Sequence, residues 1–347
     1  MEIQQYIVSK DESIYEAWPD IVKTNSGRLV CVFSECEHHI DRTNARLMIC
    51  TSDDKGRTWT KKRPLTGKGK SEDYYNCARI SKMNDGRLAI ICDKVTGGKL
   101  GEHERQTVCQ HLWFSEDDGE TWKAPMILPF CGIVPDKLRQ LKNGRMLVCA
   151  HFKNFETNKL EQYLWYSDDE GKSWSDKIVV ASDSRYNLCE VSILECENNT
   201  LIAFLRENSF EGHNIMKAIS YNNGETWEGV YDTPMSGGHR PTSGFLQDGS
   251  VLVTYRFIPS IPRSMRNVFG SILNRADLLN KQKAEQGIIT FPIAYDRNER
   301  PDLGYTGWVQ FDDGEIYVVN YIKDDSEKAY IRGYSFYTED FILRRGE

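Results

Sequence analysis

Polar residues that can bind anions or transfer protons recur at the ends of apolar, strand-like segments. One set opens these segments and contains Glu190, Arg240 and Tyr305, with His239 and Asp136 directly beside it. A second set, sixteen positions downstream, contains Arg206, Arg256 and Tyr321. Hydrophobic packing needs none of these side chains. Acids, bases, arginines and tyrosines that converge in one concave place predict an active site.

The spacing of these residues comes from a repeated hairpin. Each apolar segment is followed by an Asn-Gly or Asp-Gly turn, or its equivalent, and then by an alternating segment, which is the pattern of a β-hairpin. The turn residues are Gly27, Gly86, Gly144, Asn199, Gly249 and Gly314. The residue nine positions before each turn opens the first strand of its unit. We call these six residues the column: Trp18, Cys77, Pro135, Glu190, Arg240 and Tyr305.

A second repeated motif follows four of the hairpins. It reads Ser, any residue, Asp or Asn, any residue, Gly, any residue, Thr or Ser, Trp, and its copies begin at Ser52, Ser115, Ser167 and Ser220. Asp and Asn side chains accept hydrogen bonds from nearby backbone N–H groups, Gly supplies a positive φ, and Trp anchors the turn in the core. We therefore interpret the residues of this motif as structural.

Together the two motifs predict an all-β fold. Each unit reads as strand, hairpin turn, strand, loop, strand, Trp-containing turn and strand, and six such units make a six-bladed β-propeller of four-stranded antiparallel blades. We expect residues 1–347 to form this single domain, with residues 1–15 helping to close the ring. The innermost strands of a propeller begin around a central channel, so the column should converge on one face. Residues 102–105 are expected in a loop of the second blade that could overhang the channel.

Composition narrows the class of function. With 39% hydrophobic residues, a net charge of −7 and no apolar run that could span a bilayer, we expect neither a membrane nor a nucleic-acid partner. The N-terminus lacks the features of a secretory signal, and ten cysteines without Cys-x-x-Cys spacing indicate free thiols, so we predict a cytoplasmic protein. The adjacent His38 and His39 would face opposite sides of a strand, which argues against a metal site, and we expect no cofactor.

The Trp-containing motif resembles the Asp-box of the sialidase superfamily, and the six-unit layout is similar to a sialidase-type propeller along nearly the whole chain. Two segments carry a more specific resemblance. Residues 190–206 are similar to a sialidase segment in which a Glu precedes a substrate-binding Arg by sixteen residues. Residues 304–314 look like the segment that carries the tyrosine nucleophile of these enzymes.

This resemblance implies a glycosidase in which Tyr305 is the nucleophile and Glu190 is the base that takes its proton. A phenol with a pKa of about 10 is a poor nucleophile at neutral pH until a carboxylate accepts its proton. The resemblance also places the general acid/base at Asp41 and substrate-carboxylate ligands at Arg206 and Arg266. On the residues alone, Asp41 can equally be an exposed loop carboxylate, Glu190 and Arg206 a structural ion pair, and Tyr305 a core tyrosine.

The chain departs from sialidases at the first blade. Sialidases carry an arginine there in an Arg-Ile-Pro phrase, whereas the matching residues here are 17–19, Ala-Trp-Pro. Losing one arm of a carboxylate clamp disfavours sialic acid itself. In the fifth unit, His239 precedes Arg240 in the column, where we expect an imidazole that titrates near neutrality and can act as acid or base.

Three functions remain open at this point. The first is an exo-acting glycoside hydrolase for an acidic or deoxy sugar. The second is a lyase or glycosidase for glycans of uronic acid or rhamnose, with His239 and Arg240 in the chemistry. The third is a carbohydrate-binding propeller without catalysis. In each case the partner is a carbohydrate, and the candidate binding residues are Arg206, Arg240, Arg266, Arg256, Asp136 and Trp18.

Overall fold

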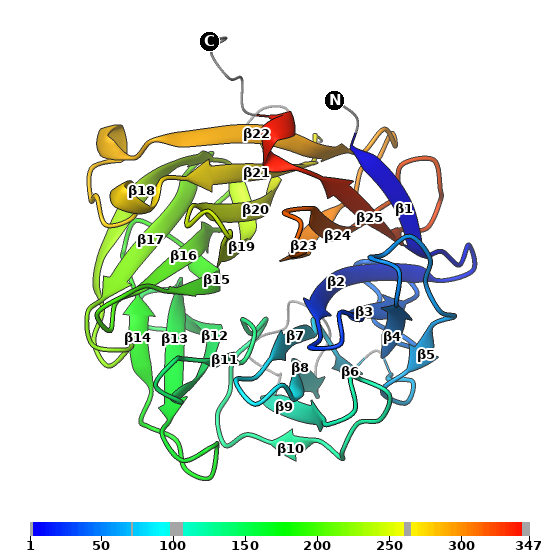
Figure 1. Cartoon of the computed structure of the whole chain (residues 1–347). Helices are drawn as coiled ribbons and strands as arrows, with labels where there is room; N and C mark the ends of the chain where they lie inside the picture. The colour runs from blue at the N-terminus through cyan, green and yellow to red at the C-terminus, as the bar shows by residue number, and fades with distance from the viewer. Residues whose placement is uncertain (1–2, 71, 98–106, 260–264, 342–347) are drawn as a thin grey trace, which may run out of the picture.

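The computed structural model describes residues 3–70, 72–97, 107–259 and 265–341. Within these ranges the strands form six antiparallel sheets that are arranged as a ring around a common axis (Figure 1). This confirms the predicted all-β fold and the six blades. The predicted loop at residues 102–105 lies outside the described residues.

The first three blades follow one another along the chain. Blade 1 consists of β2 (Tyr15–Lys23), β3 (Leu29–Cys36), β4 (Arg46–Ser52) and β5 (Arg63–Pro64). Blade 2 consists of β6 (Asp73–Tyr75), β7 (Arg79–Lys82), β8 (Leu88–Thr96), β9 (Thr107–Ser115) and β10 (Met126–Ile127). Its inner strand is interrupted, since β6 and β7 both pair with β8. Blade 3 consists of β11 (Arg139–Gln140), β12 (Met146–Asn154), β13 (Lys159–Ser167) and β14 (Ile178–Ala181).

The other three blades complete the ring. Blade 4 consists of β15 (Leu188–Glu195), β16 (Leu201–Glu207), β17 (Asn214–Ser220) and β18 (Glu228–Ser236). Blade 5 consists of β19 (Gly238–Phe245), β20 (Val251–Phe257), β21 (Asn267–Leu273) and β22 (Ile288–Tyr295). Blade 6 consists of β23 (Gly304–Gln310), β24 (Ile316–Ile322), β25 (Tyr330–Phe336) and, from the other end of the chain, β1 (Gln4–Ser9).

The pairing of β1 with β25 closes the ring. The two strands run antiparallel, with Gln4 opposite Ser335 and Ile7 opposite Arg332, and Figure 1 shows the blue β1 beside the dark red β25. The predicted help of the N-terminal residues in closure is therefore confirmed. An edge that would otherwise be open is covered by the other end of the same chain.

All six predicted hairpin turns form between the first and second strands of the blades. The turn residues all have a positive φ, which is 89° at Gly27, 91° at Gly86, 93° at Gly144, 60° at Asn199, 84° at Gly249 and 87° at Gly314. Five are glycines because an L side chain is strained in this left-handed region, and the sixth is Asn, the residue that tolerates it best after glycine.

The Trp-containing motif also folds as a turn, and its first copy shows how. The Asp54 carboxylate accepts hydrogen bonds from the backbone N–H of Thr58 at 2.9 Å and from its hydroxyl at 2.7 Å. The Trp59 indole donates to the carbonyl of Gly56 at 3.0 Å. The tryptophans are half-buried rather than sunk in the core, and the indoles of Trp122 and Trp227 donate to the glycine carbonyls of their own turns in the same way.

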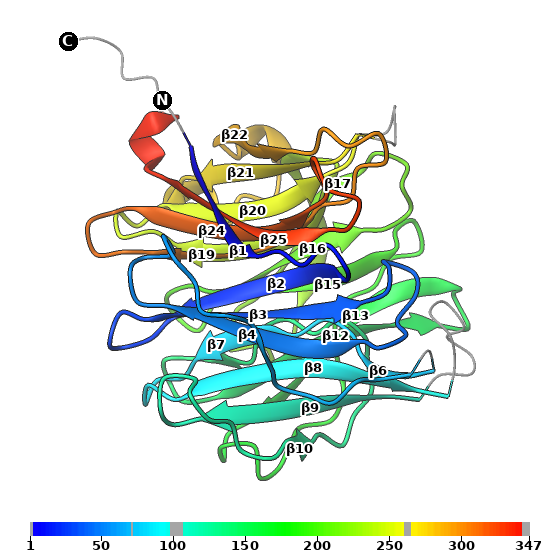
Figure 2. The same ribbon diagram turned by 90° about the vertical axis from the view of Figure 1, so that its right-hand side faces the viewer.

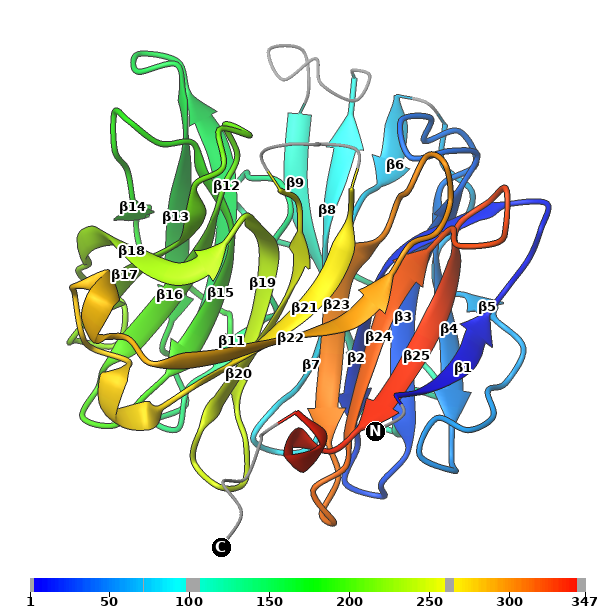
Figure 3. The same cartoon turned by 90° about the horizontal axis from the view of Figure 1, so that it is seen from above.

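The propeller has two faces that differ in which loops they carry (Figures 2 and 3). One face carries the hairpin turns that join each first strand to its second, and we call it the hairpin face. The opposite face carries the loops between second and third strands, such as residues 37–45 and 155–158, and we call it the loop face. Inner strands begin at the loop face, so the column lies there.

The helices of the described chain are the short 3₁₀ turns η1 (Arg275–Asp277), η2 (Lys283–Glu285) and η3 (Thr338–Asp340). None of them is long and apolar enough to cross a membrane.

Arg79 crosses the axis and connects several blades. From blade 2, its guanidinium donates to the hydroxyl of Thr242 in blade 5 and to the carbonyl of Thr306 in blade 6, each at 3.1 Å. It also lies 3.4 Å from the Asp20 carboxylate of blade 1, which Lys137 of blade 3 approaches at 3.0 Å. All these groups are buried or nearly so, and the cations and acceptors therefore hold the inner strands at fixed positions around the ring.

We expect Arg79→Met to destabilise the protein by about 3 kcal/mol, because it leaves buried acceptors of three blades without their donor. The matched control is Arg87→Met, which breaks an exposed ion pair with Asp85 at 2.6 Å and should cost less than about 1 kcal/mol. Urea unfolding of both variants measures the difference. Equal losses would show that Arg79 does not tie the blades together.

Candidate active site

Four residues of the column share an unusual backbone conformation. Trp18, Glu190, Arg240 and Tyr305 have φ values of 55°, 43°, 53° and 50°. In each case the register shifts by one residue at this position, so two residues of the inner strand oppose one residue of its partner. Such a bulge bends the strand and re-aims a side chain. The same bulge in blades 1, 4, 5 and 6 directs four column side chains into one cluster.

The core of this cluster is a contact between Tyr305 and Glu190. The phenol donates a hydrogen bond to one oxygen of the Glu190 carboxylate, and Arg206 donates to the other oxygen at 2.8 Å. Tyr305 is 8% exposed and Glu190 4%. Glu190 and Arg206 come from neighbouring strands of blade 4 and Tyr305 comes from blade 6, and the fold brings all three together.

The charges around Glu190 keep it ionised. Burial would raise the pKa of this carboxyl group, but Arg206, Arg240 and Arg256 outweigh burial and lower it to about 2. Burial and the negative charge of Glu190 raise the pKa of Tyr305 well above its usual value. The resting site therefore holds a protonated phenol that already points its proton at a carboxylate.

Two further arginines lie over the Tyr305 ring and keep unused donors. The guanidinium carbons of Arg240 and Arg256 are 5.5 Å and 5.2 Å from the ring centre. Arg240 donates to the carbonyl of Pro135 at 2.8 Å, and its other two nitrogens are buried without a partner among the described residues. Within the described residues, Arg256 donates only to the Tyr321 hydroxyl, at 3.5 Å. Three guanidinium groups thus face one carboxylate, and this excess of buried positive charge favours an anionic ligand.

Arg266 belongs to a neighbouring cluster centred on Asp302. Its guanidinium donates to the Asp302 carboxylate at 2.9 Å, and the same carboxylate accepts from Tyr321 at 3.2 Å and from Tyr15. The imidazole Nδ1 of His39 lies 2.7 Å from it. Arg266 is therefore near the site, but its guanidinium is committed to Asp302 rather than added to the group around Glu190.

The prediction that His239 titrates near neutrality is wrong. This imidazole is buried, with its edge against the Phe210 ring at 5.2 Å and no partner for Nδ1 among the described residues. Burial lowers its pKa far below the usual value, and Arg206, Arg256 and Arg266 lower it further. His239 is thus uncharged at neutral pH and has no proton to give as a cationic acid.

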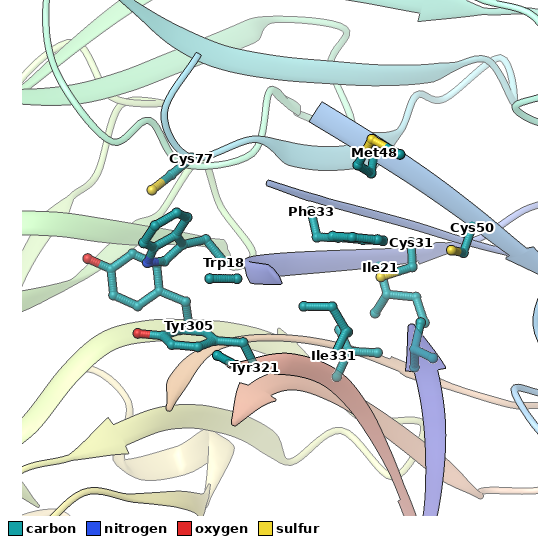
Figure 4. Close-up of a cluster of buried hydrophobic side chains, with 14 of the residues drawn as sticks. Trp18, Ile21, Cys31, Phe33, Met48, Cys50, Cys77, Tyr305, Tyr321 and Ile331 are labelled. Atoms are coloured by element: carbon teal, nitrogen blue, oxygen red, sulfur yellow. The ribbon is translucent and has the colours of Figure 1, made fainter. Parts of the chain in front are cut away.

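The first blade has Ala17 at the position of the absent arginine and an aromatic residue directly after it. Trp18 is buried and packs beside Tyr305 and Tyr321, as Figure 4 shows. The guanidinium of Arg42 stacks on the Trp18 ring at 3.6 Å. This side of the cluster therefore presents an indole ring stacked on a guanidinium instead of an arginine at its first clamp position.

The other two predicted site residues lie outside the cluster. Asp136 is buried, 3.2 Å from Arg139, and accepts from the backbone N–H of Ile193 at 3.0 Å, which joins blades 3 and 4. Asp41 is exposed in the loop between β3 and β4 and accepts from the backbone N–H of Thr43 at 2.9 Å. That hydrogen bond lowers the pKa of its carboxyl group.

The sequence did not reveal His39 and Asp302 as neighbours. His39 was considered only as a metal ligand, and the described residues contain no group of three His, Cys, Asp or Glu side chains that could hold a metal ion. Asp302 stands three positions before Tyr305, and that proximity was the one available signal. Their contact spans 263 residues of sequence, so no local pattern predicts it.

Comparisons with known proteins agree with this fold. A family model described as a BNR repeat-like domain matches residues 76–318. No functionally curated protein matches the sequence significantly. The chain is similar to a solved structure from Dyadobacter fermentans described as a protein of unknown function, with 20% identity, a TM-score of 0.78, and coverage of 95% of this chain and 97% of that one.

Two solved enzymes share the fold at lower identity. One is the Hadza microbial sialidase Hz136, with 16% identity, a TM-score of 0.74, and coverage of 97% of this chain and 69% of that one. The other is a GH93 α-L-arabinofuranosidase of Fusarium graminearum, with 11% identity, a TM-score of 0.64, and coverage of 98% and 99%. These likenesses concern the fold, which here carries enzymes for different sugars.

The charge state of Glu190 leads to a test by pH. Its folded-state pKa of about 2 lies below the ordinary value of 4.5, so its contribution to stability is complete above pH 4.5 and is lost as the pH falls toward 2. We expect wild type to lose more unfolding free energy than Glu190→Gln between pH 5 and 3. Urea unfolding at several pH values measures the slopes. The exposed Glu197, paired with Arg275, supplies the control variant Glu197→Gln, which should keep the wild-type slope. Parallel curves for wild type and Glu190→Gln would contradict the prediction.

Proposed function

This chain belongs to the family of BNR repeat-like domains, and we propose that it is a glycoside hydrolase that releases an acidic sugar with Tyr305 as nucleophile and Glu190 as base. The observation that carries the proposal is the hydrogen bond from the Tyr305 phenol to the Glu190 carboxylate. A nucleophile in direct contact with a base, which is itself held by a third group, is the arrangement that covalent catalysis requires. Arg206 is that third group.

The reaction begins when the phenol oxygen attacks the anomeric carbon and its proton passes to Glu190. The bond between that carbon and the aglycone oxygen breaks, and the aglycone leaves with a proton from solvent. A covalent sugar–tyrosine intermediate follows, and water then hydrolyses it. The Tyr305 nucleophile is neutral before attack, so a negative charge on the sugar does not repel it. The unused donors of Arg240 and Arg256 beside the phenol support a carboxylate on the sugar as the charged group.

Two other functions are outcomes of the same experiments. Turnover of a glucuronide or rhamnoside, but of no sialoside, would assign the site to uronic-acid or rhamnose glycans. Ala17 in place of the first clamp arginine favours that group over sialic acid. Binding of sugars without any cleavage would assign the chain to the carbohydrate-binding propellers. The predicted cytoplasmic location is part of the proposal and is tested by fractionation of the native cell.

We expect Tyr305→Phe and Glu190→Gln each to lower kcat by about 10²- to 10⁴-fold on whichever fluorogenic sialoside, glucuronide or rhamnoside wild type cleaves best, because one loses the nucleophile and the other its base. Tyr295→Phe is the matched control, since this tyrosine is 57% exposed on the outer strand of blade 5. If Tyr305→Phe and Glu190→Gln keep wild-type kcat, the mechanism is wrong.

Arg240 and Arg256 beside the phenol predict that the site prefers a negatively charged sugar to a neutral one. We expect the free acid of the cleaved sugar to bind at least 10-fold more tightly than its methyl ester, because the ester leaves the donors of Arg240 and Arg256 unpaired. In Arg240→Met this preference should shrink. Inhibition constants of the acid and the ester against both proteins measure it. An equal preference in wild type and variant would remove Arg240 from anion binding.

A further inference from the structure

The pair formed by His39 and Asp302 lies at the edge of the site and has no part in the chemistry described so far. His39 comes from the loop between β3 and β4 on the loop face, and Asp302 comes from the segment just before β23, which carries Tyr305. The imidazole Nδ1 and a carboxylate oxygen of Asp302 are 2.7 Å apart. An imidazole held by a carboxylate in this way is oriented and fixed in one tautomer.

Asp302 determines which imidazole nitrogen carries the proton. Burial would raise the pKa of Asp302, but hydrogen bonds from His39 and Tyr15 and the charge of Arg266 lower it far below the usual value. Asp302 is therefore a carboxylate and can only accept hydrogen bonds. It follows that Nδ1 of His39 carries the proton and donates it, so the lone pair of the neutral ring is on Nε2.

His39 places this lone pair next to the cluster around Tyr305 and Glu190. Its ring stands edge-on to the column residue Trp18, with centroids 5.4 Å apart. Asp302 also accepts from Tyr321, and the Tyr321 hydroxyl contacts Arg256, which lies over the Tyr305 ring. Within the described part of the chain, Nε2 of His39 makes no hydrogen bond, and the side chain is 31% exposed. Water can therefore reach Nε2 at the margin of the site.

Asp41 does not compete for this position. It lies in the same loop, but its carboxylate is exposed and bonded to Thr43, and the charged groups that act on it are His38 and Lys328 rather than the arginines of the site. His39 and Arg42 both reach the cluster from this loop, through contacts with Trp18, and of the two only His39 can accept a proton.

We propose that His39 is the general base that activates water to release the sugar from Tyr305, and that Asp302 is the residue that positions it. This inference rests on the proposed function. In the step, a water O–H bond breaks and its proton moves to Nε2 while the oxygen bonds to the anomeric carbon. The bond between that carbon and the Tyr305 oxygen breaks, its electron pair returns to the phenol, and the phenol recovers the proton held by Glu190. The imidazolium then gives its proton to solvent. This balances the proton that solvent gave to the departing aglycone in the first step.

The surroundings of His39 suit a base at neutral pH. The groups that face the ring are Asp302, Tyr15, Trp18, Arg42 and Arg256. Burial lowers the pKa of His39, Arg42 and Arg256 lower it further, and Asp302 opposes them without restoring the ordinary value of 6.5. The ring is therefore neutral at pH 7, and hydrolysis of the intermediate should slow only when the pH falls through this lowered pKa.

The test compares His39→Gln with His38→Gln on the best aryl glycoside of the wild-type enzyme. His38 is the adjacent imidazole, and it is exposed and makes no side-chain hydrogen bond to any described residue. Its variant therefore controls for disturbance of the loop and should keep kcat within about twofold. In His39→Gln we expect kcat to fall about 10²-fold or more, while the first burst of aglycone remains. The sugar adduct on Tyr305 should accumulate and be visible by intact mass. Azide, which needs no base, should restore turnover and give the glycosyl azide.

A second pair of variants separates catalysis from folding. His39→Ala should regain activity with added imidazole, whereas Asp302→Asn should keep binding but lose the pH dependence of the hydrolysis step. The proposal is overturned if His39→Gln keeps the kcat and pH profile of wild type, or if it loses activity with neither adduct nor rescue. An absence of glycoside turnover in wild type would instead refute the proposed function itself, and with it this role for His39.

Discussion

A single buried guanidinium at the axis sets the geometry of this propeller. Arg79 hydrogen-bonds to blades 5 and 6 and faces the Asp20 carboxylate of blade 1, which Lys137 of blade 3 shares. A cation this deeply buried is tolerated only when acceptors surround it. The inner strands must therefore meet at fixed positions, and their starts, where the column stands, are held in a fixed arrangement on one face.

The direction of the column side chains depends on a backbone bulge that recurs in four blades. In four blades the inner strand begins with a bulge whose first residue has a positive φ, a conformation that costs a non-glycine residue about 1–3 kcal/mol. Trp18 adopts it as well as Glu190 and Tyr305, so the bulge belongs to the architecture rather than to one reaction. The bulges direct the side chains of these positions into one cluster, and the residue type at each position determines the chemistry.

Electrostatics divides the site into an inner and an outer layer. In the inner layer, three arginines keep Glu190 charged while Tyr305 keeps its proton. In the outer layer, Asp302 is charged because Arg266, two tyrosine hydroxyls and His39 all donate to it or lie against it. Tyr321 links the layers through Arg256. Proton acceptors are thus present in both layers, and the arginines around Tyr305 favour an anion.

The sequence by itself determined the six blades, the hairpin turns and the closing strand, because these depend on local turn chemistry and a regular repeat. It also determined the column, since a fixed distance from each turn locates Glu190, Arg240 and Tyr305. Only the tertiary structure decided which of these side chains meet and how they are charged. His239 showed this most clearly: its type suggested a group that titrates near neutrality, and burial among arginines removed that property. The contact of His39 with Asp302 joins residues from opposite ends of the chain, and such contacts, like the pKa values they set, arise from distances and burial that exist only once the ring has closed.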